Sequence, residues 1–180
     1  MGIYFLGIKI SESDKKKLKI QSWPAISYLK DANLVPTYNW HYSLAFIGKL
    51  DQIQVDTLKL RLIENKWPAR FKLGMKGFGG FPALEECRVL YVGVQRGEEV
   101  LTSLAKQLRK LMDNIGIEYD QKPFVPHLTL LRLNSPRNLL ELKDNGKMKQ
   151  EIVTDVHQFT LYYSQQDKSL YQEVLQIDLP

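Results

Sequence analysis

The sequence has very little cysteine: Cys87 is the single one among 180 residues. One cysteine excludes an intrachain disulfide, and it leaves a cysteine-based zinc site without its other ligands. Because Cys87 lies between Glu86 and Arg88 at the expected start of a strand, we interpret it as structural. Histidine is also scarce, with three in the chain, so the pattern around each of them is informative.

Long hydrophobic runs are missing as well. The apolar stretch at residues 3–10 is interrupted by Gly7 and Lys9, and it is too short to span a bilayer. It has neither the basic region nor the small-residue cleavage site of a signal peptide. Leu6 stands where N-myristoylation requires Ser or Thr. We therefore expect a cytoplasmic protein that has no membrane partner.

Acidic residues are fewer than basic ones, 20 Asp and Glu against 25 Lys and Arg, and the net charge is +5. This excess favours anionic partners, because Lys and Arg lower the cost of bringing phosphates close. The lysine run at residues 15–19 is more typical of the solvated face of a helix than of a nucleic-acid site. A hydrophobic content of 44% and a charged content of 25% indicate an ordinary soluble globular protein.

Apolar periodicity predicts a mixed order of strands and helices. We expect strands at residues 3–10, 40–47, 71–75, 88–95, 127–133, 152–164 and 170–179. We expect helices at residues 11–31, 51–65 and 100–115, the last closed by Gly116 and with an apolar face of Val100, Leu104, Leu108, Leu111 and Ile115.

Other segments read as turns and loops. Residues 33–39 are an expected loop, and residues 137–150 are an expected loop with a helical turn. Pro136 should end the strand that precedes this second loop, and residues 165–168 should form a turn. The glycine-rich run at residues 77–82 lacks the Lys and Ser/Thr of a phosphate-binding P-loop. We interpret this run as a turn or a bulge.

Two segments share one pattern: His41-Tyr42-Ser43-Leu44 and His127-Leu128-Thr129-Leu130. Each places an imidazole two residues before a hydroxyl inside an expected strand, where side chains two apart point to the same face. The segments lie nearly half the chain length apart, and each follows a helix and a proline-bearing loop. This arrangement indicates a weak internal duplication.

The duplication predicts the fold class and the domain organisation. We expect an α+β protein of two pseudo-symmetric lobes, each a mainly antiparallel sheet with helices, around a central cleft. No Gly/Ser/Pro-rich linker divides the chain, so residues 1–180 should form a single two-lobed domain. Each lobe would then contribute one histidine motif to the cleft.

Two facing His-x-Ser/Thr pairs suit displacement at the phosphorus of a phosphodiester. One imidazole would act as base and the other as acid, which is chemistry that histidine performs near neutral pH. Ser43 and Thr129 would donate hydrogen bonds to the non-bridging oxygens. This scheme requires neither a metal nor another cofactor. Taken alone, each motif is more often structural than catalytic, and His157, which lacks the pattern, is interpreted as structural.

The chain resembles the two-histidine phosphoesterase superfamily, and within it the LigT-like RNA 2′,3′-cyclic phosphodiesterases, also called 2′-5′ RNA ligases. The resemblance rests on residues 41–48 (HYSLAFIG), on residues 123–132 (PFVPHLTLLR), and on GGFP at 79–82 followed by RVLYVGV at 88–94. It departs from the family at Ser43, where Thr is usual, and at Tyr42, where a small aliphatic residue is usual.

This resemblance implies hydrolysis of an RNA or nucleotide 2′,3′-cyclic phosphate to a 2′-phosphomonoester. Carried over by position, His41 would be the general acid and His127 the general base, and Ser43, Thr129 and Arg132 would bind the phosphate. The sequence itself does not decide which histidine is the acid and which is the base. Ligation of 2′-5′ RNA would be the reverse chemistry.

Several alternatives stay open. The same chemistry could act on 2′-5′ oligoadenylates or on another small cyclic phosphate, and the same fold could serve as a non-catalytic RNA or nucleotide-binding module. We expect a monomer. An RNA end needs an aromatic platform for its base, and the candidates are Tyr4, Phe5, Trp40 and Tyr163. We assign none of them this role, because most of the aromatic residues should belong to the core.

Overall fold

The computed structural model describes residues 2–144, 148, 150–165 and 170–180. The elements follow in the order β1 (Ile3–Lys9), α1 (Glu12–Ile26), β2 (Ala32–Leu34), a 3-10 turn (Thr37–Asn39), β3 (His41–Gly48), α2 (Gln52–Glu64), β4 (Phe71–Phe81), β5 (Cys87–Arg96), α3 (Glu98–Asn114), β6 (His127–Arg137), α4 (Glu141–Asp144), β7 (Ile152–Val156), β8 (Gln158–Ser164) and β9 (Gln172–Asp178).

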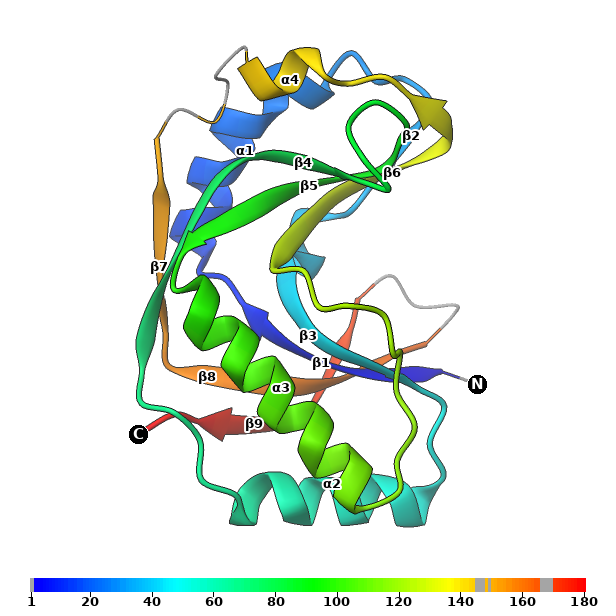
Figure 1. Cartoon of the computed structure of the whole chain (residues 1–180), viewed down its shortest axis with the longest axis vertical. Helices are drawn as coiled ribbons and strands as arrows, with labels where there is room; N and C mark the ends of the chain where they lie inside the picture. The colour runs from blue at the N-terminus through cyan, green and yellow to red at the C-terminus, as the bar shows by residue number, and fades with distance from the viewer. Residues whose placement is uncertain (1, 145–147, 149, 166–169) are drawn as a thin grey trace.

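The strands form two separate antiparallel sheets. One has the order β3-β1-β8-β9 and the other the order β2-β6-β5-β4-β7. Figure 1 shows the four-stranded sheet in the lower lobe, which also contains both chain ends, and the five-stranded sheet in the upper lobe. The predicted α+β class with two antiparallel sheets is confirmed.

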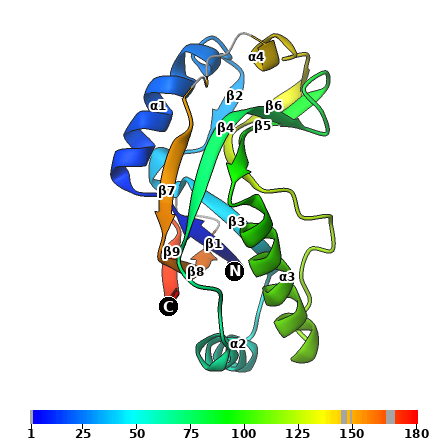
Figure 2. The ribbon, with the colours of Figure 1, turned by 60° about the vertical axis from the view of Figure 1, so that its left-hand side comes forward.

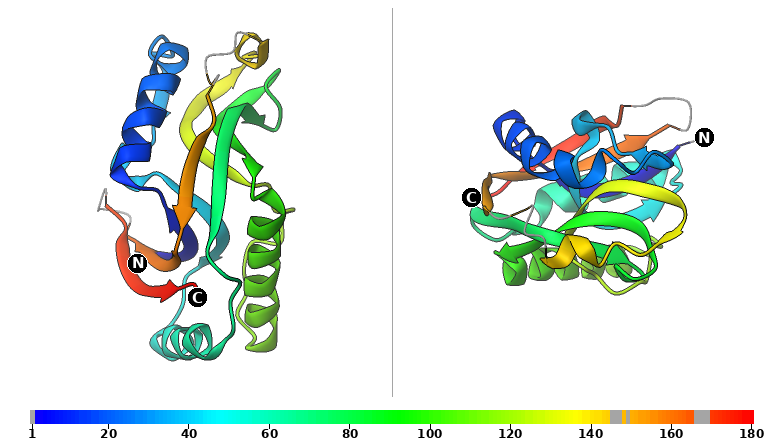
Figure 3. Two further views of the ribbon diagram at one scale, coloured as in Figure 1. Left: turned by 90° about the vertical axis from the view of Figure 1, so that its left-hand side faces the viewer. Right: turned by 90° about the horizontal axis from the view of Figure 1, so that it is seen from above.

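The lobes are not successive halves of the chain, because the helices cross between them. The helix after β1, α1, packs against β7 of the other sheet, and the helix after β5, α3, packs against β3. Figure 3 shows α1 beside the upper lobe and α3 beside the lower lobe, on opposite sides of the molecule. Each lobe therefore depends on a helix that follows a strand of the other.

The helix α3 buries a face slightly rotated from the predicted one. Leu104 and Leu108 are buried as expected, but the rest of the buried face is Leu101, Ala105 and Met112, whereas Val100 is half-buried. The helix packs against β3, and the position of that strand relative to the helix is not defined by periodicity alone. Gly116, with φ at +68°, follows the end of the helix as predicted.

The single strand predicted at residues 152–164 is wrong. It is two strands divided at His157: β7 pairs with β4, whereas β8 pairs with β1 and β9. Figure 2 shows β7 between α1 and β4 before the chain passes to the other lobe. Burial alternates along β7, whereas residues 159–162 of β8 are all buried, and the two strands are separated by their pairing with different distant strands.

Pro136 does not end its strand, contrary to the prediction, because β6 continues to Arg137. The proline is tolerated because the pairing with β5 is irregular between Cys87 and Val89, so no regular ladder bond is lost. The expected loop at residues 33–39 overlaps the end of β2, which pairs with β6. The first helix ends at Ile26 instead of residue 31.

The glycine-rich run is a bulge inside the long strand β4, as one of its two interpretations predicts. The register with β5 shifts between Met75 and Phe78, and Gly77 adopts φ of +76°.

Most of the turn predicted at residues 165–168 lies outside the described residues. In the part of the chain that the structure describes, no helix has the length and apolar character needed to cross a membrane.

Candidate active site

The two histidine motifs occupy equivalent positions in the two lobes. His41 begins β3, which pairs with β1, and His127 begins β6, which pairs with β5. In both pairs the register shifts just after the hydroxyl residue, so that Leu44 and Leu130 are bulged out of the ladder. The duplicated sequence pattern is therefore a duplicated backbone structure.

The bulges decide which side chains face the cleft. Leu44 and Ala45 are both buried, as are Leu130 and Leu131, because the bulge interrupts the alternation. The residue five positions after each histidine is then exposed, Phe46 in the first motif and Arg132 in the second. The motifs thus extend from His-x-Ser/Thr to include an aromatic ring in one lobe and a guanidinium in the other.

A backbone carbonyl orients each imidazole. Nδ1 of His41 lies 2.6 Å from the carbonyl oxygen of Asn39, and Nδ1 of His127 lies 2.6 Å from that of Val125. A carbonyl oxygen only accepts, so each Nδ1 carries a hydrogen and donates it. Nε2 is left in both rings as the nitrogen that accepts a proton when the ring is neutral and donates one when it is charged.

Burial keeps both imidazoles neutral in the free protein. Desolvation, with a smaller contribution from the nearby His127 and against the effect of the Asn39 carbonyl, lowers the pKa of His41 to about 4. Desolvation also lowers the pKa of His127, with a contribution from the charge of Arg132. An imidazole that acts as acid must therefore regain its proton when an anionic substrate binds.

A small hollow joins the two motifs. It has a volume of about 150 Å³, and its lining includes His41, Ser43, Phe46, Thr129 and Arg132. Within it the Ser43 hydroxyl lies 3.0 Å from Nε2 of His41, which accepts a hydrogen bond from it when neutral. The structure thus brings four of the five predicted site residues together at one small polar space, suited to a phosphate group.

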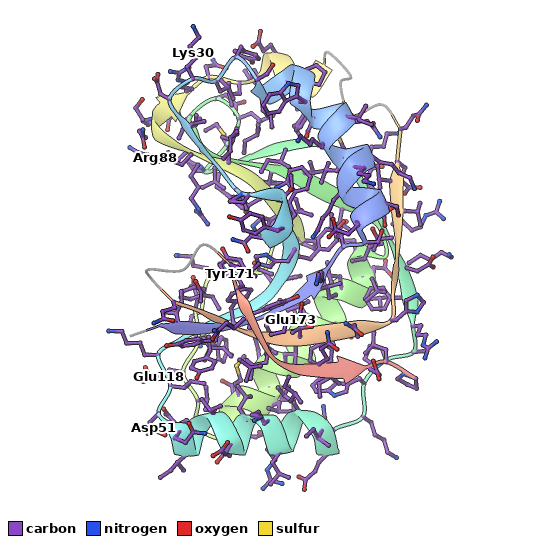
Figure 4. All side chains as sticks on the ribbon, turned by 180° about the vertical axis from the view of Figure 1, so that it is seen from behind. Lys30, Asp51, Arg88, Glu118, Tyr171 and Glu173 are labelled. Atoms are coloured by element: carbon purple, nitrogen blue, oxygen red, sulfur yellow. The ribbon has the colours of Figure 1, made fainter. Side chains whose placement is uncertain are left out.

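A larger hollow adjoins each histidine. One, of about 580 Å³, lies beside His41 and includes Trp40, Tyr162 and Tyr171. The other, of about 530 Å³, includes Ser43 together with His127, the fifth predicted site residue. Figure 4 shows Lys30 and Arg88 on the upper lobe and Tyr171 on the lower one, on the same side of the molecule. Each larger hollow has the size of a small-molecule site.

Aromatic rings pack around both imidazoles. The rings of Phe5 and Tyr171 contact His41, with centroid distances of 4.9 and 5.6 Å. Phe81 and Tyr91 contact His127 at 4.9 and 5.2 Å. This packing fixes the ring planes, and it accounts for the desolvation of both histidines.

The four candidate base platforms are mostly not available to a ligand. Trp40 and Phe5 are 3% and 5% exposed, and the rings of Tyr4 and Tyr163 contact each other at 4.9 Å. Phe46, which we did not predict, is 48% exposed and lines two of the hollows. Phe46 stands five residues after His41, as Arg132 stands five residues after His127. This equal spacing was the signal in the sequence that could have identified Phe46 as a site residue.

The remaining residues of interest lie away from these hollows. Cys87 is fully buried, and His157 lies outside the three hollows, with its carbonyl accepting a hydrogen bond from the Leu179 amide. Tyr42 is fully buried, and among the described residues its hydroxyl has no hydrogen-bond partner. The phenol therefore points into the core and does not reach the cleft.

Known proteins share this sequence and architecture. The chain is 31% identical over 101 residues to the RNA 2′,3′-cyclic phosphodiesterase of Aeropyrum pernix, an alignment that covers 56% of this chain and 57% of that protein. It is 36% identical over 103 residues to the protein of the same name from Aquifex aeolicus, with 56% and 55% covered. The alignments thus span little more than half the length of these relatives.

Solved structures and a family model extend the similarity to most of the chain. Escherichia coli LigT complexed with 3′-AMP superimposes with a TM-score of 0.75 over 99% of this chain and 98% of that chain, at 24% identity, which shows a common fold. The model of the 2′-5′ RNA ligase superfamily matches residues 18–168. The chain therefore belongs to the 2′-5′ RNA ligase superfamily.

Proposed function

We propose that this protein hydrolyses RNA or nucleotide 2′,3′-cyclic phosphates to 2′-phosphomonoesters without a metal or another cofactor. The observation that carries the proposal is the pair of imidazoles, each oriented through Nδ1 by a backbone carbonyl. His41 lines the small hollow with Ser43, Thr129 and Arg132, and His127 lines the adjoining hollow that shares Ser43 and Phe46 with it. The names of the relatives from Aeropyrum and Aquifex support the same reaction.

In the proposed reaction a water molecule attacks phosphorus and the bond from phosphorus to the 3′ oxygen breaks. Nε2 of His127 takes the proton from water, and Nε2 of His41 gives a proton to the departing 3′ oxygen. Ser43, Thr129 and Arg132 bind the non-bridging oxygens as negative charge develops there. The product keeps its phosphate on the 2′ oxygen and has a free 3′ hydroxyl.

Other attributes belong to the same proposal. We infer that residues 1–180 act as a single two-lobed domain, that the protein is a cytoplasmic monomer, and that it binds RNA 3′ ends or nucleotides. The complex of LigT with 3′-AMP supports a nucleotide ligand. Comparison of rates on 2′-5′ oligoadenylate and other cyclic phosphates separates the alternative substrates, whereas tight product binding without turnover would identify a binding module.

The test of the proposed reaction is turnover of adenosine 2′,3′-cyclic phosphate in the presence of EDTA. We expect hydrolysis at the same rate with and without the chelator, because the imidazoles transfer the protons. A rate abolished by EDTA and restored by a divalent cation would contradict the metal-independent scheme.

The lowered histidine pKa values predict the pH dependence. We expect a bell-shaped profile of kcat/KM with an optimum below pH 6.5, because kcat/KM reports the free protein, where both pKa values are lowered. The profile of kcat should lie at higher pH, since a bound phosphate anion raises both pKa values. Steady-state rates between pH 4 and 9 test this, and coincident optima above pH 7 would contradict it.

The exposed ring of Phe46 predicts a contribution to base binding. We expect Phe46→Ala to lower kcat/KM on adenosine 2′,3′-cyclic phosphate about tenfold, within the range for loss of one base-stacking aromatic. Trp23, also 48% exposed but on α1, provides a matched control, and Trp23→Ala should keep the wild-type rate. Equal rates for the two variants would exclude Phe46 as the platform.

A further inference from the structure

The larger hollow beside His127, which we call the His127-side hollow, differs in charge from the one beside His41. Its lining includes three cations, Arg88, Arg109 and Lys122, and a single carboxylate, Asp120. The lining of the His41-side hollow has one cation, Lys9, which forms an ion pair of 2.9 Å with Glu173. Of these two larger hollows, and among the described residues, the His127-side hollow therefore has the excess of positive charge to offer a polyanion.

The cations of this hollow are only partly compensated. Among the described residues no carboxylate forms an ion pair with Arg88. Lys122 is 84% exposed and lies 3.3 Å from Asp120, an exposed contact that contributes little. Both side chains are therefore able to contact a phosphate at little cost.

The lining of the same hollow also has apolar and aromatic side chains: Phe46, Phe81, Pro82, Phe124 and Val125. The amide of Asp120 donates a hydrogen bond of 2.8 Å to the Phe46 carbonyl, which attaches the loop before the second motif to the edge of β3. Aromatic side chains together with cations are the combination by which proteins bind single-stranded nucleic acid, through base stacking and phosphate contacts.

The hollow also opens onto the reaction centre, because Ser43 and His127 belong to its lining. A volume of about 530 Å³ greatly exceeds what an attacking water needs. A terminal cyclic nucleotide bound at the small polar hollow would place its preceding nucleotide in an adjoining space. Charge favours the His127-side hollow for that nucleotide.

We propose that the His127-side hollow binds the penultimate nucleotide of an unpaired RNA 3′ end, with Arg88 and Lys122 contacting its backbone phosphates. The inference rests on the proposed function. It makes RNA oligonucleotides, rather than free cyclic mononucleotides, the better substrate class. It also assigns to Arg88 and Lys122 a role in substrate length preference.

The test compares adenosine 2′,3′-cyclic phosphate with an unpaired six-nucleotide RNA ending in A and a 2′,3′-cyclic phosphate. The wild type should have the higher kcat/KM on the RNA. In the double variant Arg88→Gln/Lys122→Gln, the ratio of kcat/KM for RNA to that for the mononucleotide should fall about tenfold, because phosphate contacts are lost. Lys66→Gln, an exposed lysine outside the hollows, should keep the wild-type ratio.

Salt dependence gives an independent readout. The slope of log Kd against log salt concentration, measured with the same RNA ending in a 2′-phosphate, should become shallower by about 0.7 for each phosphate contact removed. An unchanged ratio and slope in the double variant would overturn the inference, as would a wild type indifferent to RNA length. A wild type that hydrolyses neither substrate would instead overturn the proposed function.

Discussion

Replacing His41 or His127 by alanine is expected to lower kcat on adenosine 2′,3′-cyclic phosphate by about 10²–10⁴-fold, the usual effect of losing one general acid or base. Each ring has Nδ1 bonded to a carbonyl, so Nε2 is the atom that transfers the proton, and alanine removes it. Because both imidazoles act in one displacement, the double variant should lose little more than the slower single variant.

The third histidine provides the control for this experiment. His157→Ala removes an exposed imidazole outside the three hollows, and its rate should stay within about twofold of the wild type. Circular dichroism and thermal unfolding establish that all the variants are folded. A near wild-type rate in either His41→Ala or His127→Ala would refute the paired-histidine mechanism.

Replacing Arg132 by glutamine should lower kcat/KM by about 10²-fold, comparable to the loss of one donor that stabilises a developing oxyanion. Its guanidinium lines the small hollow together with Ser43 and Thr129, where the non-bridging oxygens would lie. Its charge also lowers the pKa of His127. Removing that charge raises the pKa, so the limb of the pH profile that His127 governs should move to higher pH.

This shift separates a role at the phosphate from a merely structural one. Arg137 is on the same strand, pairs with Asp31 and lies outside the three hollows, so Arg137→Gln should change neither the rate nor the profile appreciably. A loss of rate in Arg132→Gln without any shift of the profile would contradict the proximity of this charge to His127.

The sequence was sufficient to predict the two motif strands and the placement of one histidine motif in each of the two sheets. Both follow from local signals: apolar alternation, helical periodicity and a repeated imidazole-x-hydroxyl pattern. The capping box at the start of α2 is also a local signal, because Asp51 and Gln54 are only three residues apart in the sequence. Local signals of this kind need no knowledge of distant partners.

Features that depend on distant pairing could not be predicted in this way. The division of residues 152–164 at His157 reflects pairing with two different sheets, and the bulges at Leu44 and Leu130 reflect the registers with β1 and β5. The exposure of Phe46 follows from its bulge. Phe46 was therefore missed, although Arg132, which stands at the same distance from its histidine, was predicted from the family resemblance.

The most direct test of the paired-histidine proposal is to incubate the protein with an RNA that ends in a 2′,3′-cyclic phosphate and identify the phosphomonoester formed. We predict a 2′-phosphate as the sole product, formed in the presence of EDTA, because the acid protonates the 3′ oxygen. Release of a 3′-phosphate would contradict the assigned geometry, and an intact cyclic phosphate after prolonged incubation would contradict the proposed activity itself.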